Sequence, residues 1–551
     1  MMMKVLKAAW RGVLYPLSNR FFLYVLFLNL ISNYASAWYV NDWLSLFYIC
    51  FLSAFIAYCE AFIYALLRPY WLKKAYAVFV GVLLNILCVT DYFLMINFQQ
   101  DIYQDVIDIL AETNAVEAAG FVETYMQFGT ISLWVLACLA LNVLLFFAVR
   151  YVYRMRYKAV ALLLAFLGLL TFSWCVYGYA VYRNGMNIPQ LTTLTRSGYA
   201  LYLVKVRMQE IANLRVVNKN LKVSQRAGRK PTVVVVIGES FSVYHSSLYG
   251  YDKPTNPLLG KRLADGSLFL LNNAVTLEPF TTASMCADFS LDSLGVGFAN
   301  KALFPACFRR AGYYTAMFDN QYFAGHGISF LADRELSGVL YDDRNTEQYR
   351  YDGDMVKTIT PKNSPSLYII HLYGQHYSYK ERYPKAFSKF KAEHYPAKYS
   401  PLQRQIIAHY DNATLYNDYV VDHIMDKFKD EYCVVFYFSD HGEEVFEVRN
   451  YIGHGSAEHS PNPNYQLRIP FMVWLSPAYA EANPAMKEKL KAAFDYPVCA
   501  DDVGHTLIDM AGITCDDFAP TRSFINDKFN KRRHRVVMHS VDYDASWIKM
   551  R

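Results

Sequence analysis

The fold of this chain is decided by the stretch Thr232-Val233-Val234-Val235-Val236-Ile237-Gly238-Glu239-Ser240. Its first six residues are all β-branched, and an unbroken run of this kind is typical of a strand that is buried on both faces of a parallel sheet. The run stops at a glycine and then presents a carboxylate and a hydroxyl. Because the carboxyl ends of strands in an open α/β sheet meet at one crevice, we expect Glu239 to face residues from neighbouring strand ends.

A second strand supplies such residues. The apolar run Cys433–Phe438 leads into Ser439-Asp440-His441-Gly442-Glu443-Glu444. Carboxylates and imidazoles together suit zinc, which binds both in a tetrahedron and, in catalytic sites, keeps one position for the reacting group. We therefore interpret Glu239, Asp440 and His441 as metal ligands. The pair Glu443–Glu444 is interpreted as a charged edge of the site.

An oxygen nucleophile is expected in the loop Glu278–Cys286, which is rich in hydroxyl side chains. A hydroxyl beside zinc becomes acidic enough to attack phosphorus or carbon. Thr281 is the first choice.

Residues 231–551 alternate strand-like and helix-like stretches, which indicates one α/β domain with a mostly parallel sheet covered on both faces. The predicted strands, besides the two above, are Tyr313–Phe318, Ser366–His371 and Ile469–Leu475, and the clearest predicted helices are Lys487–Phe494 and Asp502–Ala511.

Residues 1–180 hold most of the excess in a chain that is 54% hydrophobic. Five apolar runs, at 21–40, 44–67, 76–98, 131–149 and 159–179, are each long enough to cross a bilayer, which predicts an α-helical membrane domain of five transmembrane helices. Basic residues gather in the connections around Arg68 and Arg154, whereas 99–130 has no Lys or Arg. The positive-inside rule then places the N-terminus in the cytoplasm and everything after residue 180 outside.

We accordingly expect a multi-pass protein of the bacterial inner membrane with a periplasmic domain at 231–551. Residues 181–230 are interpreted as a linker with a bridging helix. The acidic segment 99–130 has a patchy apolar stripe, which fits either interfacial helices on the outer leaflet or a solvated connector.

Two further features limit the function. A net charge of +6 with scattered basic residues excludes the dense basic patch of a nucleic-acid-binding protein. Of the ten cysteines, four are candidates for disulfides in an oxidising compartment, with the pairing open: Cys286, Cys307, Cys499 and Cys515.

The order of these motifs resembles a known family. The IGES stretch, the loop Thr281-Thr282-Ala283-Ser284, the FSDHGEE stretch and Gly453-His454-Gly455 are similar to those of the lipid A phosphoethanolamine transferases. These are membrane-anchored members of the alkaline phosphatase and sulfatase superfamily. Where better-known members carry cysteines on both sides of the nucleophile, this chain has Leu277 upstream and keeps only Cys286, which leaves Thr282 as a rival to Thr281.

The resemblance implies that Glu239, Thr281, Asp440 and His441 bind zinc, with Thr281 as the nucleophile. It implies that His376 and His454 bind substrate or a second metal, or act as general acid and base. In the segment Glu112–Glu117, Thr113 and Glu117 match positions that line the lipid-substrate site.

The resemblance implies transfer of phosphoethanolamine from phosphatidylethanolamine to an envelope acceptor, with a lipid A phosphate as the first candidate. The enzyme is expected to be a monomer. The reaction is expected to pass through a covalent phosphoethanolamine-threonine intermediate. Two alternatives stay open: a phosphoglycerol transferase of the lipoteichoic acid synthase type, and a non-catalytic membrane scaffold.

Overall fold

A computed structural model gives the architecture and describes residues 12–40, 43–98, 128–155, 157–182, 193–292, 298–321, 330–345, 347–455, 457, 460–538 and 541–547. The chain divides into two compact units, Met1–Lys205 and Val206–Arg551.

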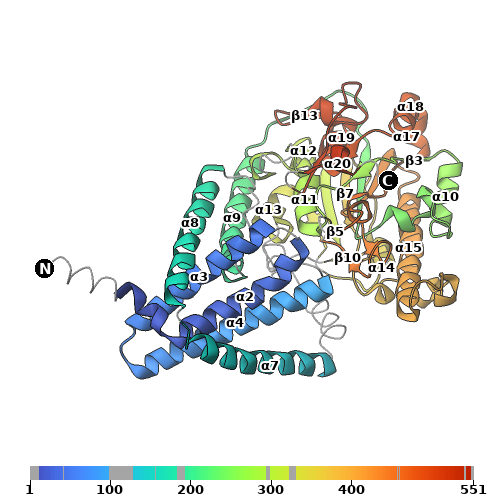
Figure 1. The fold of residues 1–551 in the computed structure, drawn as a ribbon. Helices are drawn as coiled ribbons and strands as arrows, with labels where there is room; N and C mark the ends of the chain where they lie inside the picture. The colour runs from blue at the N-terminus through green and yellow to red at the C-terminus, as the bar shows by residue number, and fades with distance from the viewer. Residues whose placement is uncertain are drawn as a thin grey trace. The chain divides into compact units, whose positions relative to one another are not determined.

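Long apolar helices make up the first unit (Figure 1): α2 (Arg20–Val40), α3 (Trp43–Leu66), α4 (Tyr70–Phe98), α7 (Phe128–Val152) and α8 (Lys158–Tyr182). Within the described residues, three helical segments are long and apolar enough to cross a membrane: Phe47–Leu66, Tyr70–Asn97 and Ser132–Val152. They match the second, third and fourth predicted spans. The first and fifth predicted spans coincide with helices α2 and α8, and a total of five spans stays a prediction.

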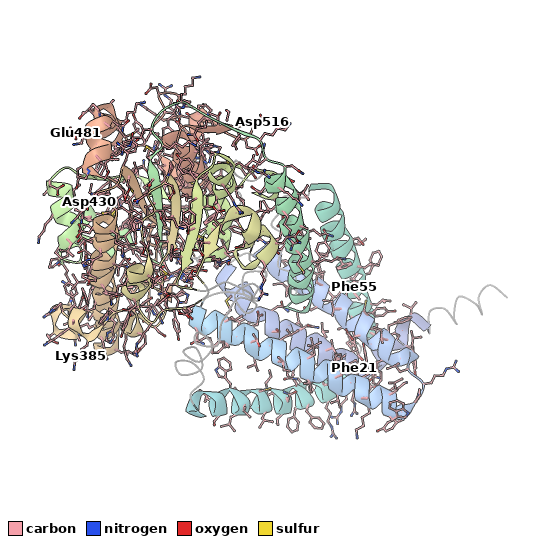
Figure 2. The ribbon with its side chains drawn as sticks, turned by 180° about the vertical axis from the view of Figure 1, so that it is seen from behind. Phe21, Phe55, Lys385, Asp430, Glu481 and Asp516 are labelled. Carbon is pink, nitrogen blue, oxygen red and sulfur yellow. The ribbon has the colours of Figure 1, made fainter. Side chains whose placement is uncertain are left out.

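Aromatic pairs join these helices. Phe21 of α2 stacks on Tyr64 of α3 with ring centroids 4.9 Å apart, and Phe55 of α3 meets Phe172 of α8 at 5.7 Å. Phe21 and Phe55 are labelled among the helices in Figure 2. Lipid tails are as apolar as these rings, so such pairs act through packing rather than through exclusion of water.

A seven-stranded sheet forms the centre of the second unit, with strand order β3-β11-β8-β2-β7-β5-β6. The strands are β2 (Thr232–Gly238), β3 (Leu268–Leu270), β5 (Tyr314–Asp319), β6 (Asp343–Arg344), β7 (Ser366–His371), β8 (Cys433–Ser439) and β11 (Phe471–Leu475). The pairs from β8 through to β6 are parallel. Strand β11, however, is antiparallel to both β8 and β3, so the sheet is mixed.

Helices cover both faces of this sheet (Figure 1). Val233, Val235 and Ile237 share a core with α11 (Thr281–Phe289), α12 (Phe304–Arg310), α13 (Arg334–Leu340), α18 (Pro484–Ala492) and α19 (Val503–Met510). Val234 and Val236 share the opposite core with α10 (Pro257–Ala264), α14 (Asp352–Thr358) and α15 (Pro401–Lys427). The alternation of side chains along β2 thus buries both of its faces.

Helix α9 (Thr193–Lys219), which continues from the first unit, and several short elements complete the unit. The remaining described α-helices are α16 (Asn464–Leu467), α17 (Pro477–Ala482) and α20 (Tyr543–Ser546). Four two-stranded sheets pair β1 (Val223–Gln225) with β13 (Ile513–Cys515), β4 (Ala274–Val275) with β12 (Val498–Cys499), β9 (Glu444–Val445) with β10 (Ile452–Gly453), and β14 (Val536–Val537) with β15 (Val541–Asp542).

Candidate active site

Glu239 lies immediately after β2, and its side chain is fully buried. Ser240 adopts a φ of 55°, so the chain turns sharply at the end of the strand. The Ser240 hydroxyl donates to Glu239 Oε1 at 2.6 Å, and Gln321 Nε2 donates to Oε2 at 2.6 Å. These two hydrogen bonds hold the carboxylate in one orientation.

Asp440 and His441 reach the same place because β8 is the parallel neighbour of β2. Gly238 is in register with Ser439, and the Asp440 amide donates to the Gly238 carbonyl at 3.0 Å. The two strands therefore end side by side and bring Glu239, Asp440 and His441 together. Ligand atoms of these three buried residues all lie within 4.8 Å of one another.

The tautomer of His441 is set by its surroundings. Its Nδ1 lies 2.9 Å from the Gly442 carbonyl oxygen, which can only accept. Nδ1 thus carries a proton, and Nε2 faces Glu239 Oε1 at 3.4 Å and Asp440 Oδ2 at 3.2 Å. A histidine that binds a metal through one ring nitrogen usually donates a hydrogen bond from the other nitrogen.

The electrostatics of this cluster call for a cation. Burial raises the pKa of Asp440 well above its usual range, and the charge of Glu239 raises it further. Among the described residues, buried Asp440 Oδ2 has no hydrogen-bond partner. A buried acceptor of this kind costs free energy unless a proton or a metal satisfies it. The donor set of two carboxylates and one imidazole therefore fits zinc.

Thr281 brings a hydroxyl to this cluster. It is the first residue of helix α11, and its Oγ1 lies 3.1 Å from Glu239 Oε2 and 3.3 Å from His441 Nε2. The N-terminus of a helix also carries a partial positive charge that favours an anion. Thr281 thus lies beside the three residues that the sequence predicts as metal ligands.

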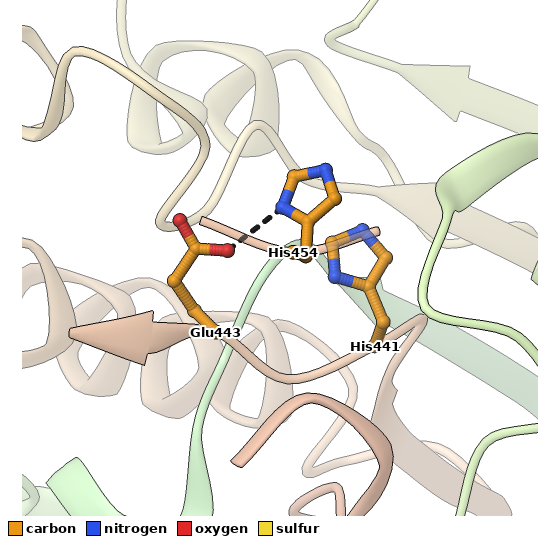
Figure 3. Close-up of side chains that lie close together, drawn as sticks. All are labelled: His441, Glu443 and His454. Atoms are coloured by element: carbon orange, nitrogen blue, oxygen red, sulfur yellow. Dashed lines mark hydrogen bonds and ion pairs between the residues drawn. The ribbon is translucent and has the colours of Figure 1, made fainter. Parts of the chain in front are cut away.

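His454 lies next to His441, with the ring centroids 4.0 Å apart. Its Nδ1 is 2.7 Å from Glu443 Oε2 (Figure 3). Tyr379 donates its hydroxyl to the other oxygen of Glu443. His441, Glu443 and His454 form a second group whose spacing could hold a cation.

The interpretation of Glu443 and Glu444 as a charged edge was wrong for both residues. Glu443 is buried against His454, and Glu444 is fully buried and paired with Arg449, whose Nε lies 2.9 Å from Oε1. The burial of Glu443 could not be predicted from the sequence, because its partner His454 is eleven residues further along the chain.

His376 lies in the loop after β7 and stacks on Tyr373 with ring centroids 5.1 Å apart. Burial lowers the pKa of His376 to about 4, and the charge of Glu239 only partly opposes this shift. The imidazole is therefore neutral at pH 7. The loop itself lies against Glu239, because the backbone N–H of Gln375 donates to the Glu239 carbonyl at 3.0 Å.

Gly374 explains why this loop can approach so closely. It has a φ of 45°, and a Cβ built there would lie 2.9 Å from the backbone nitrogen and oxygen of Glu239. Only glycine fits this position without displacing Glu239.

The sequence did not predict that a row of polar residues would contact one another behind Glu239. Gln321 Nε2 lies 3.1 Å from His371 Nε2, and His371 Nδ1 lies 3.0 Å from Asp319 Oδ1. Arg344 completes the row with a 3.1 Å contact to Asp319 Oδ2. A usable signal existed, since Asp319 and Gln321 follow the predicted strand Tyr313–Phe318 closely, as Glu239 follows its own strand.

The remaining two predicted site residues, Thr113 and Glu117, lie outside the described residues, as does the whole segment 99–127.

Comparison with known proteins places the chain in a family. Residues 231–513, more than half of the chain, match the sulfatase family, and the chain belongs to it. Within that family it is similar to enzymes that transfer phosphoethanolamine. The phosphoethanolamine transferase EptC of Escherichia coli O18:K1:H7 is 28% identical over 499 residues, which cover 83% of each chain.

Two solved structures extend the likeness. The periplasmic domain of E. coli EptC in complex with zinc is 28% identical, with a TM-score of 0.52, and the match covers 60% of this chain and 96% of that one. The integral membrane protein EptA of Neisseria meningitidis has a TM-score of 0.62 at 20% identity, over 91% of this chain and 97% of that one. The match to EptA covers residues of both units and shows that the two proteins share a fold.

Proposed function

We propose that this protein transfers phosphoethanolamine from phosphatidylethanolamine to an acceptor in the bacterial envelope, with a phosphate of lipid A as the first candidate. The observation that carries the proposal is the position of the Thr281 hydroxyl, 3.1 Å from Glu239 Oε2 and 3.3 Å from His441 Nε2. The names of the curated relatives and the zinc-bound EptC domain support it.

Glu239, Asp440, His441 and Thr281 would hold the zinc. When bound, the ion supplies positive charge that makes the hydroxyl acidic and stabilises the oxygens of the phosphoryl group. The chain itself orients the nucleophile. The Thr281 proton points toward Glu239 Oε2, which leaves an oxygen lone pair free to attack the phosphorus of the donor lipid.

The first step forms a bond between Thr281 Oγ1 and phosphorus and breaks the bond to the diacylglycerol oxygen. We assign protonation of that leaving oxygen to His454, because Glu443 holds its Nδ1 at 2.7 Å and would stabilise the imidazolium. His376, neutral at pH 7 through its lowered pKa, suits binding of the substrate or acceptance of a proton. In the second step the acceptor oxygen bonds to phosphorus, the bond between phosphorus and Thr281 Oγ1 breaks, and His454 takes up the proton of the acceptor and so recovers the one that it gave.

The test is a transfer assay with the full-length protein in detergent, ethanolamine-labelled phosphatidylethanolamine and lipid A. We expect labelled lipid A, loss of the product on chelation and its return with zinc. Asp440→Asn should lower transfer by about 100-fold or more, because it removes a ligand charge from the buried cluster. Asp354→Asn, which alters a surface carboxylate paired with Lys357, is the matched control.

Three outcomes would count against the proposal. Transfer that survives both chelation and Asp440→Asn would remove the metal site from the reaction. Transfer from phosphatidylglycerol in place of phosphatidylethanolamine would change the headgroup. A complete lack of transfer, with zinc bound and the protein folded, would leave the scaffold alternative.

A further inference from the structure

Two of the four cysteines that the sequence left unpaired meet in the structure. Cys307 belongs to helix α12 and Cys515 ends strand β13, 208 residues later, and their sulfur atoms are 4.0 Å apart. Both side chains are free thiols here. A disulfide bond needs a sulfur separation of about 2.05 Å, so a small side-chain rotation separates this contact from a covalent link.

The backbone on either side holds the two thiols together. Asp517, two residues after Cys515, accepts the amide of Ala302 at 2.9 Å and pairs with Lys301 at 3.0 Å, just before helix α12 begins. The Phe518 amide donates to the Cys515 carbonyl at 3.1 Å. The two segments are therefore fixed against each other independently of the sulfurs.

We propose that Cys307 and Cys515 form a structural disulfide in the mature protein. The proposal is independent of the transfer reaction, but it does require that this unit reaches an oxidising compartment. The bond would tie helix α12 to the β1–β13 pair, in which Cys515 is in register with Val223. Since β1 follows α9, the disulfide would fasten the strand by which the chain enters the sheet-containing core.

The chemistry needs an oxidant, and we assign it to a thiol oxidoreductase in its disulfide form. Cys515 is half-buried and Cys307 fully buried, so Cys515 is the thiol that such a protein can reach. Its thiolate attacks one sulfur of the donor disulfide and expels the other as a thiolate. Cys307 then attacks the Cys515 sulfur and expels the second donor sulfur. The chain loses two protons and two electrons, and the donor ends as two thiols.

The thiol pair itself favours this order of attack. The contact between the two sulfurs lowers the pKa of the Cys515 thiol, and the same contact, together with burial, raises the pKa of Cys307. Cys515, the half-buried and therefore more accessible thiol, is thus also the better nucleophile.

The test is peptide mapping of the full-length protein, acid-quenched in cells and alkylated without reductant. Trypsin should release Ala302–Arg309 linked to Ala492–Arg522. Because the second peptide carries both Cys499 and Cys515, fragment ions must place the link on Cys515. Alkylation of both Cys307 and Cys515 in the quenched protein would overturn the proposal, as would a link through Cys499.

Thermal unfolding gives an independent readout. Closing a loop of this length restricts the unfolded chain strongly, so reductant should lower the Tm of the wild-type protein by roughly 5 °C. The Cys307→Ala/Cys515→Ala variant should start lower and no longer respond to reductant. Cys433→Ala, in the core strand β8, should still respond. An equal response to reductant in the double variant would contradict the disulfide.

Discussion

Ser240 holds a backbone conformation that few residues other than glycine adopt, and it does so directly beside Glu239, a proposed metal ligand. Its φ of 55° costs on the order of 1 kcal/mol. Tyr410 of helix α15 holds the turn in place: its hydroxyl donates to the Ser240 carbonyl at 2.6 Å and accepts from the Ser242 amide at 2.9 Å. Tyr410 is thus a positioning residue. It fixes the turn next to Glu239 through the backbone of Ser240 and Ser242, and neither hydrogen bond involves Glu239 itself.

Tyr410→Phe should therefore weaken the metal site without removing a ligand. We expect a loss of about 10- to 100-fold in zinc affinity, and a destabilisation of about 1–3 kcal/mol because two buried backbone groups lose their partner. Zinc competition with a chromogenic chelator measures the first effect and thermal unfolding the second.

Tyr416→Phe is the matched control, since Tyr416 lies on the same helix and its hydroxyl accepts from the Gly353 amide at 3.1 Å. It should cost stability and leave zinc affinity unchanged. Equal losses of zinc affinity in the two variants would show that Tyr410 acts through general stability alone.

The positions of single residues could be predicted where those residues directly follow a predicted strand. Glu239, Asp440 and His441 follow apolar runs, so their convergence could be predicted from the order of strands and polar ends. Gln321 also follows a predicted strand, but its hydrogen bond to Glu239 and the contact of Glu443 with His454 could not be predicted from the sequence. Their roles come from contacts between segments far apart in the chain.

Three elements meet at His245, which follows β2 by a short loop. Its Nδ1 lies 2.6 Å from Asp411 of α15, and its Nε2 lies 3.1 Å from Glu447 in the turn between β9 and β10. Burial alone would lower the pKa of His245, but the two carboxylates outweigh burial and raise it to about 10. The imidazolium therefore ties together the loop, the helix and the hairpin that surround the site.

This contact predicts a pH-dependent stability. Because the folded pKa is raised above the unfolded value of about 6.5, the stabilisation is complete below that pH and is lost as the pH rises toward 10. His245→Gln should cost about 3–5 kcal/mol at pH 6, and the difference from wild type should shrink between pH 6.5 and 10. Thermal unfolding of both proteins across this range measures the difference.

His534→Gln, which changes an exposed histidine paired with Asp542, should leave stability nearly unchanged at every pH. A gap between His245→Gln and wild type that stays constant or widens with rising pH would refute the ion-pair interpretation.

The sequence patterns predicted that a strand exists better than they predicted whether it runs parallel or antiparallel to its neighbours. Strand β11 was predicted at Ile469–Leu475 and observed at Phe471–Leu475, but its antiparallel orientation was not foreseen. A buried strand is apolar whichever way it runs, so its composition carries no direction. The direction depends on the connection from β8, which includes the β9–β10 hairpin and helix α16.

For the whole molecule, the membrane topology decides which lipids can reach the site. The charge of the connections predicts that reporters fused after residues 70 and 155 lie in the cytoplasm and that a reporter after residue 230 lies in the periplasm. Phosphatase and fluorescent reporters at these three positions measure it. A cytoplasmic signal at 230 would separate the second unit from a periplasmic acceptor and would also imply an even number of spans.

The covalent intermediate on Thr281 is the central claim, and one measurement tests it most directly. Full-length protein with zinc is incubated with phosphatidylethanolamine in the absence of acceptor, and its peptides are analysed by mass spectrometry. We predict one phosphoethanolamine group on Thr281, none on that peptide in Thr281→Ala, and an unchanged adduct in Thr282→Ala. An adduct on Thr282 in the wild-type protein, or normal transfer without any adduct, would contradict the account.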